Sequence, residues 1–223
     1  AIIMESRYYK RPFDLSLLLV SHILLAPLLL LLWIVLPVAI WANDRGAIFY
    51  VQRRLGKDGK EFKLFKFRSM VPGAENETGA VLASEDDPRI TPIGRLMRAR
   101  ALDELPQLIN LWRGDLSLVG PRPERPELFS KIVVDLPNFN DRLKVRPGLT
   151  GVAQVFGRYS SEPRIKLRYD RLYIKNMSPF LDISILLKSI LTHSSKFFTS
   201  FLRCFHDLHQ FKLDRHLGRW STH

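Results

Sequence analysis

Cysteine is almost absent from this sequence, since Cys204 is the single one among 223 residues. One cysteine cannot form a disulfide within the chain, and it excludes a zinc site built from cysteines. Acidic residues are scarce relative to basic ones, with 22 Asp and Glu against 34 Lys and Arg, which gives a formal charge of +12. This excess favours an anionic partner such as nucleic acid, acidic lipid or a phosphorylated substrate.

Charged residues are missing entirely from the apolar run Leu15 to Ala42. As a straight helix this run would be about 42 Å long, more than the ~30 Å hydrocarbon core of a bilayer requires. A signal peptide does not fit, because the run is too long and no small-residue cleavage site follows it. Pro27 lies near its middle, where it removes a backbone donor and bends a helix. The sequence therefore predicts a membrane segment that bends at Pro27.

Basic residues flank both ends of the apolar run. They are Arg7, Lys10 and Arg11 before it, and Arg45, Arg53, Arg54 and Lys57 after it. A spanning helix should show an excess on one side only. Two-sided charge favours a re-entrant hairpin whose ends both return to the cytoplasmic face. An ordinary spanning helix stays the alternative, because prolines also kink true spanning helices.

The remaining chain predicts an α+β fold, with a small, mostly helical domain that contains one β-hairpin. The β-prone runs 48–53 and 62–68 flank the turn residues Gly56 to Gly59. Helices are predicted over 93–100, 105–112, 127–136, 164–174 and 181–191, and irregular chain over 72–88, 114–126 and 146–158. We expect a membrane part at 1–44, a catalytic part at 45–192 and a tail at 193–223.

The tail combines aromatic and basic residues at helical spacing. Its apolar positions are Phe198, Phe201, Leu202, Phe205 and Leu208, and its basic ones include Lys196, Arg203, Lys212, Arg215 and Arg219. Such a pattern is typical of an amphipathic helix at the membrane interface. It suits equally well a helix packed on the catalytic core or on another subunit.

Asp103 and Glu104 are the strongest candidates for chemistry. An Asp-Glu pair before a helix often only caps it and favours its dipole. Here Arg95, Arg98 and Arg100 precede the pair, and basic neighbours keep a carboxylate ionised. An ionised Asp can attack phosphorus, and a neighbouring Glu can hold Mg²⁺ against a diphosphate.

Basic residues elsewhere offer sites for phosphate. Arg122 lies between Pro121 and Pro123, which restrict the backbone that presents its planar guanidinium. Lys66 in the second strand faces either phosphate or water. The glycine-punctuated loop from Arg146 to Arg158 is basic and suits close approach to a nucleotide, although it lacks a Walker or Rossmann spacing.

Three motifs, in this order, resemble the bacterial sugar transferases, also called monotopic phosphoglycosyl transferases. The motifs are KFRSM at Lys66–Met70, RARALDELPQLINLWRGDLSLVGPRP at Arg98–Pro123 and RPGLTGVAQVFGR at Arg146–Arg158. The resemblance runs from about Tyr9 to Leu191. It implies transfer of a sugar-1-phosphate from a UDP-sugar to polyprenyl phosphate, usually undecaprenyl phosphate, at the cytoplasmic face of the bacterial inner membrane.

The resemblance also implies roles for single residues. Asp103 corresponds to the nucleophile and Glu104 to its Mg²⁺-binding partner. Further positions match basic or polar residues of the family's active site, namely Lys66, Arg98, Arg122, Arg158 and Asp170. With Arg146 from the glycine-punctuated loop, they form the predicted substrate-binding set.

The family's membrane helix is re-entrant and breaks at a Ser-Pro pair, where this chain has Ala26-Pro27. Glu124 to Glu127 resembles the exopolysaccharide branch, many members of which carry an additional N-terminal multi-span region. We therefore expect either a catalytic fragment or a naturally short form. The expected partners are the two substrates and membrane lipids, with a homo-oligomer left open.

A rival hypothesis is a non-catalytic, basic scaffold on the membrane that recruits glycan-assembly enzymes. Such a module has no use for Asp103 and Glu104 among arginines, whereas a transferase needs both. Nucleic-acid binding explains the charge but not the apolar run. The sequence does not identify the sugar.

Overall fold

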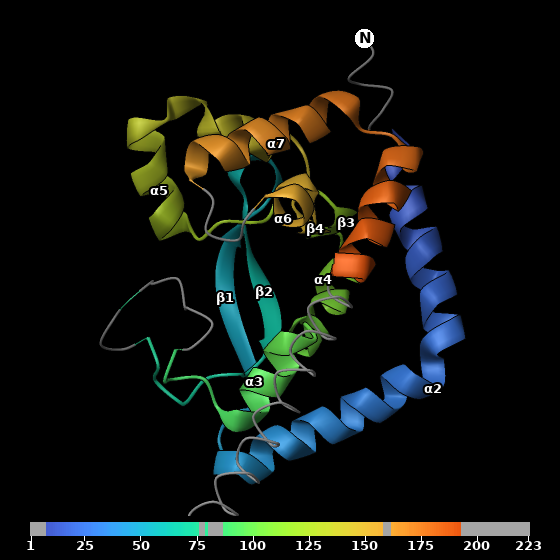
Figure 1. Ribbon diagram of the computed structural model, residues 1–223, viewed down its shortest axis with the longest axis vertical. Helices are drawn as coiled ribbons and strands as arrows, with labels where there is room; N and C mark the ends of the chain where they lie inside the picture. Colours follow the sequence, from blue (N-terminus) through green and yellow to red (C-terminus); the bar gives the residue numbers. More distant parts are fainter. Residues whose placement is uncertain (1–7, 76–78, 80–86, 158–161, 193–223) are drawn as a thin grey trace, which may run out of the picture.

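The computed structural model describes residues 8–75, 79, 87–157 and 162–192 (Figure 1). Arg158 and the tail predicted over 193–223 lie outside these described residues. Helices dominate the described part, together with two small two-stranded sheets. The predicted α+β class with mostly helical content is confirmed.

Helix α2, Lys10–Asp44, contains the whole uncharged run and both Pro27 and Pro37. It is one bent helix, not two separate ones, and its two limbs meet at an angle (Figure 1). The helix ends at Arg45, which adopts a left-handed conformation with φ 54°. A bent helix agrees with the two prolines inside α2, while a re-entrant course through a bilayer stays a prediction.

The two ends of α2 pack on the domain, and its middle does not. Leu18 joins a buried cluster with Leu64 and Leu111, and Ile40 joins another with Phe67 and Met97. Between them most of the apolar side chains are exposed, including Ile23, Leu24, Leu30 and Ile34. Leaving one such side chain in water costs about 1.5–3 kcal/mol. The middle of α2, a helix long and apolar enough to cross a membrane, thus favours an apolar environment.

The predicted hairpin is present. Strand β1, Phe49–Leu55, pairs antiparallel with β2, Glu61–Phe67, in a register that sets Tyr50 opposite Lys66. A 3₁₀ turn over Lys57–Gly59 joins them. Asp58 and Gly59 have positive φ angles in this turn, a conformation that Asp and Gly tolerate better than most residues.

Two short helices follow the hairpin and frame the acidic pair. Helix α3, Pro92–Ala99, begins at Thr91, whose hydroxyl accepts a hydrogen bond from the Gly94 amide. Helix α4, Gln107–Arg113, ends at Gly114, which has φ 84°. Both lie within two residues of their predicted bounds.

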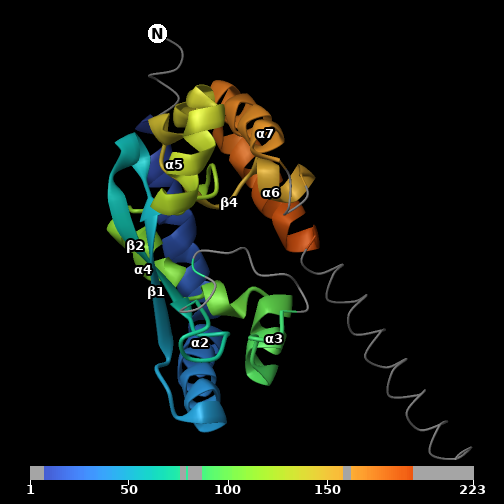
Figure 2. The ribbon, with the colours of Figure 1, turned by 90° about the vertical axis from the view of Figure 1, so that its left-hand side faces the viewer.

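The rest of the domain consists of short elements, of which α5, α6 and α7 gather around the end of the hairpin away from α3 (Figures 1 and 2). These are β3, Ser117–Val119; α5, Pro126–Asp135; a 3₁₀ helix, Pro137–Lys144; β4, Gly148–Thr150; α6, Val152–Phe156; α7, Pro163–Asn176; and a helix over 179–192. Strands β3 and β4 pair in parallel. The prediction of irregular chain over 114–126 and 146–158 was wrong at β3, β4 and α6. These elements have three to five residues, too few to show a hydrophobic period.

Candidate active site

The acidic pair lies in a 3₁₀ turn between α3 and α4. Ala101, with φ 52°, reverses the chain, and Leu102–Glu104 forms the turn. Asp103 does not cap α4, because that helix begins after Pro106 and has no side-chain cap. The simple capping interpretation of Asp103 is therefore excluded. Asp103 is only 7% exposed. Because burying a charged carboxylate costs free energy, a polar or charged partner must offset that cost.

Asn110 helps to bring this turn to β2. Its side chain is fully buried, accepts a hydrogen bond from the Phe65 amide at 3.1 Å and donates to the Lys63 carbonyl at 2.7 Å. It thus pairs with the edge of β2 as a neighbouring strand would. The α4 backbone is fixed beside the strand that carries Lys66.

Lys66 contacts both acids. Its Nζ lies 2.9 Å from Oε1 of Glu104 and 3.9 Å from Oδ2 of Asp103. Arg122, from the loop between β3 and α5, donates from Nη2 to the same Glu104 oxygen at 3.1 Å. The structure therefore brings together Lys66, Arg122 and the two acids, which lie up to 56 residues apart in the sequence.

The two acids differ in their ionisation. Burial raises the pKa of Asp103, an effect that Lys66 opposes and the Glu104 carboxylate reinforces. Burial also penalises the charged form of Glu104, but the cations of Lys66 and Arg122 outweigh it and hold the pKa of Glu104 well below its usual range. Glu104 is the fixed anion of the site, and the charge of Asp103 depends on its neighbours.

Arg98 lies on α3 at the edge of the same site. Its Nε donates to Oγ of Ser69 at 2.9 Å, and its positive charge lowers the pKa of Asp103. Helix α3 approaches this segment so closely that a Cβ on Gly94 would lie 1.9 Å from the Ser69 carbonyl oxygen. Gly94 is therefore required for the position of Arg98.

In the described part of the chain, two other residues of the predicted substrate-binding set, Arg146 and Asp170, do not contact the acidic pair. Arg146 precedes β4 and makes no ion pair with the acidic residues among the described residues. Asp170 on α7 is 2% exposed, and its Oδ2 accepts from Nε of Arg142 at 3.0 Å. Burial raises the pKa of Asp170, while Arg142 opposes this shift. Asp170 lies behind the Arg122 loop, in contact with Arg142 and not with the acidic pair.

The acidic pair offers donors for a divalent cation. Both hydrogen bonds to Glu104 reach Oε1, and within the described part of the chain none reaches Oε2. Carboxylate oxygen is the donor that Mg²⁺ prefers. No group of three or more His, Cys, Asp and Glu gathers within the described residues. Asp103 and Glu104 are donors that suit Mg²⁺, and further ligands would have to come from outside this pair.

Sequence reasoning missed three charged contacts in the domain. Arg142 binds Asp170, Arg68 forms a bidentate pair with Asp44 at the end of α2, and Lys10 binds Asp182 at 2.7 Å. Each joins residues that are distant in sequence. A single sequence shows no period or spacing that predicts such pairs, although the cluster of motifs around Arg68 pointed to the neighbourhood.

A sequence model of the family described as bacterial sugar transferase matches residues 5–196. Curated relatives include the UDP-N-acetylgalactosamine-undecaprenyl-phosphate N-acetylgalactosaminephosphotransferase of Aeromonas hydrophila, 37% identical over 188 residues. That alignment covers 83% of this chain and 43% of the relative.

Two other relatives show the same pattern of similarity. The undecaprenyl-phosphate galactose phosphotransferase of Salmonella typhimurium is 36% identical over 199 residues, which cover 83% of this chain and 40% of that protein. The exopolysaccharide production protein ExoY of Rhizobium meliloti is 36% identical over 198 residues, 81% of this chain and 83% of that protein. The matched region of this chain thus spans about two fifths of the first two relatives and most of ExoY.

Proposed function

Because this chain belongs to the bacterial sugar transferase family, we propose that it transfers a sugar-1-phosphate from a UDP-sugar to polyprenyl phosphate. The observation that carries this proposal is the contact of Lys66 with the buried Asp103 and the partly exposed Glu104, and of Arg122 with Glu104. A nucleophilic carboxylate, a second carboxylate and two cations at one place are the groups that transfer of a phosphoryl group requires.

In the first step, the Asp103 carboxylate attacks the β-phosphorus of the UDP-sugar. A new bond forms between Oδ and phosphorus, and the bond from phosphorus to the oxygen that bridges the two phosphates breaks. The bridging oxygen keeps the electron pair and leaves as part of UMP. The sugar-phosphate stays on Asp103 as an acyl-phosphate.

In the second step, a phosphate oxygen of polyprenyl phosphate attacks the same phosphorus. The bond to Asp103 breaks, the carboxylate is regenerated, and the product is a polyprenyl diphosphate sugar. Lys66 and Arg122 stabilise the negative charge on the phosphate oxygens in both steps, because their cations already point at the site. When bound, Mg²⁺ would be held by Glu104 and would neutralise charge on the diphosphate.

Contacts at both ends of α2 support a re-entrant course at the membrane. Lys10 near the beginning of α2 pairs with Asp182, and Asp44 at its end pairs with Arg68, so both ends contact the same domain. The exposed apolar middle then enters and leaves the bilayer on the side where the domain lies. We place this side at the cytoplasmic face of the inner membrane, where nucleotide sugars are available.

The rival scaffold does not account for the site. A scaffold that binds acidic lipid would gain nothing from a buried Asp103 beside a Glu104 with 19% of its side chain exposed, because desolvating carboxylates costs free energy. The test of the proposed function is UMP release from UDP-N-acetylgalactosamine, UDP-galactose and UDP-glucose, with and without undecaprenyl phosphate. Turnover that depends on the lipid supports the transferase. No UMP release from a broad panel of UDP-sugars would overturn it.

A further inference from the structure

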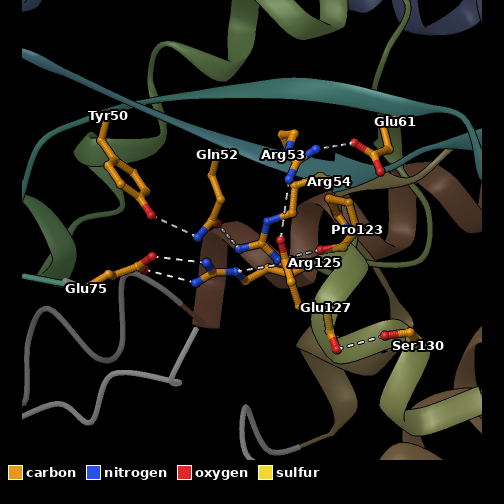
Figure 3. Close-up of polar contacts among 10 residues, drawn as sticks. All are labelled: Tyr50, Gln52, Arg53, Arg54, Glu61, Glu75, Pro123, Arg125, Glu127 and Ser130. Atoms are coloured by element: carbon orange, nitrogen blue, oxygen red, sulfur yellow. Dashed lines mark hydrogen bonds and ion pairs between the residues drawn. The ribbon is translucent and has the colours of Figure 1, made fainter. Parts of the chain in front are cut away.

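The loop that carries Arg122 is held at every carbonyl from Pro121 to Glu124. In this order, the four oxygens accept from the Gly148 amide at 2.9 Å, Arg142 Nη2 at 2.9 Å, Arg54 Nη1 at 2.8 Å and the Leu55 amide at 3.0 Å. Figure 3 shows the contact of Arg54 with Pro123. With prolines on both sides of Arg122, the main chain of the loop has little freedom left.

A second anchor lies just after the loop. Arg125 forms two hydrogen bonds with the Glu75 carboxylate, each 3.0 Å long, and Tyr50 and Gln52 of β1 lie beside them (Figure 3). The Arg125 contacts tie the end of the loop to Glu75, while the bonds from Arg54 and Leu55 tie the loop to β1. Arg142 contacts the main chain of Arg122 itself, because its Nη2 donates to the Arg122 carbonyl.

Arg142 is buried deeply, with 3% of its side chain exposed, and its guanidinium lies over the Phe139 ring at 4.6 Å. Nη2 is shared between the Arg122 carbonyl and Oδ2 of Asp170, which is 2.8 Å away. Nη1 lies 3.2 Å from Oε1 of Glu124. The planar guanidinium thus joins the loop, α7 and the 3₁₀ helix in one arrangement that a lysine could not reproduce.

A buried ion pair of this kind is an expensive way to stabilise a fold. Desolvating both charges costs several kcal/mol per ion, and apolar residues of similar volume often serve stability equally well. Asp170 is 2% exposed, and its carboxylate pairs with Arg142. The pair does, however, hold the carbonyl of Arg122, which lies next to the Cα atom that carries the Arg122 side chain.

We propose that Arg142 and Asp170 are positioning residues that hold the main chain of Arg122 so that its guanidinium meets Glu104 and the donor diphosphate. This inference rests on the proposed function, since it assigns the pair to the same site. It gives Asp170 an indirect role, through Arg142, in place of direct substrate binding.

The test compares Arg142→Lys with Arg171→Lys. Arg171 joins the same two elements, α7 and the 3₁₀ helix, through a 2.5 Å contact with Asp141, but it is 46% exposed and does not meet the loop. Arg142→Lys should lower kcat for UMP release about 10- to 100-fold, because a shift of ~1 Å in a positioning group costs up to that factor. Arg171→Lys should stay within about twofold of wild type. Equal activity of Arg142→Lys and wild type would overturn the proposal.

A double-mutant cycle separates positioning from a general effect on folding. Arg122→Lys should lower kcat on its own, and adding Arg142→Lys should lower it little further, because there is no longer an Arg122 guanidinium to position. The melting temperature should still fall with each Arg142 substitution. If the two losses in kcat multiply in full, Arg142 acts independently of Arg122 and the proposal is wrong.

Should Arg142→Lys fail to fold, the paired variant Arg142→Gln with Asp170→Asn removes both buried charges together. The proposal expects this variant to fold and to turn over slowly, and a folded variant with wild-type kcat would overturn it. Failure of the proposed function looks different, because the wild-type enzyme would then release no UMP.

Discussion

Lys66 Nζ lies 2.9 Å from Oε1 of Glu104, and the same ammonium group is 3.9 Å from Oδ2 of Asp103. One cation therefore serves two carboxylates whose pKa values move in opposite directions. The closer contact keeps Glu104 ionised, together with Arg122. The longer one opposes the burial that raises the pKa of Asp103.

Replacing Lys66 with methionine should shift the acid limb of the pH–activity profile to higher pH. Asp103 attacks only as the carboxylate, so activity falls as the pH drops through its pKa. Burial and the Glu104 carboxylate raise the pKa of Asp103, and the Lys66 cation lowers it. When Lys66 is removed, the pKa of Asp103 therefore rises further. The measurement is kcat for UMP release against pH. Lys63→Met, an exposed lysine on the same strand, is the matched control.

An acid limb of Lys66→Met at the wild-type position, even with lower turnover, would show that Lys66 does not set the ionisation of Asp103.

Glu104→Gln should weaken the use of Mg²⁺, because a neutral amide is a poorer ligand for a hard cation than a carboxylate. We expect at least about a tenfold loss of activity, partly recovered at higher Mg²⁺ concentration. Glu127→Gln, an exposed acid on α5, is the control. A Mg²⁺ titration of Glu104→Gln with an unchanged midpoint would remove Glu104 from the metal site.

Cysteines placed at Tyr8 and Asn43, with Cys204 replaced, should both react from the cytoplasmic side of intact cells. Both positions are exposed and flank the apolar helix. A re-entrant α2 brings them to the same face, and a spanning α2 brings them to opposite faces. Pro27→Ala should increase labelling from opposite sides, because proline favours the bend. Labelling of the unmodified helix from opposite sides would refute the re-entrant course.

Asp44→Asn should slow the lipid-dependent step several-fold and leave formation of the covalent intermediate nearly unchanged. Asp44 ties the end of the membrane helix to Arg68, two residues beyond Lys66, so its loss frees the membrane limb and not the acidic pair. Single-turnover assays of each step measure the difference. Asp58→Asn, an exposed acid in the hairpin turn, is the control. Equal slowing of both steps by Asp44→Asn would contradict this role.

Much of the fold was predictable from local signals. The uncharged run predicted α2, and the turn residues Gly56 to Gly59 predicted the hairpin. The helices α4 and α7 were predicted to within a few residues of their bounds. Strands β3 and β4 were not predictable, since each has three residues and depends on a partner about 30 residues away. Gly148 illustrates this dependence on a distant partner. A Cβ atom on Gly148 would lie 2.0 Å from the amide nitrogen of Gly120, so only the folded structure shows why glycine is needed.

The site residues also divide into those that local motifs predicted and those that depend on packing. Asp103, Glu104, Lys66 and Arg122 were predicted from motifs, and the structure brings them into contact. Arg142 was missed because buried charge is a property of packing, and a lone arginine in a polar segment looks like surface. Predictions on Arg158 and the tail concern residues outside the described part.

The central claim is that Asp103 becomes covalently bonded to the sugar-phosphate. The most direct measurement incubates the protein with a UDP-sugar radiolabelled in the β-phosphate, without a lipid acceptor, and follows label on the denatured protein. The wild type should carry the label and lose it when polyprenyl phosphate is added, while Asp103→Asn should carry none, because an amide oxygen is a poor nucleophile toward phosphorus. Labelling of Asp103→Asn to the same extent as wild type, or label on a wild-type peptide without Asp103, would contradict the account.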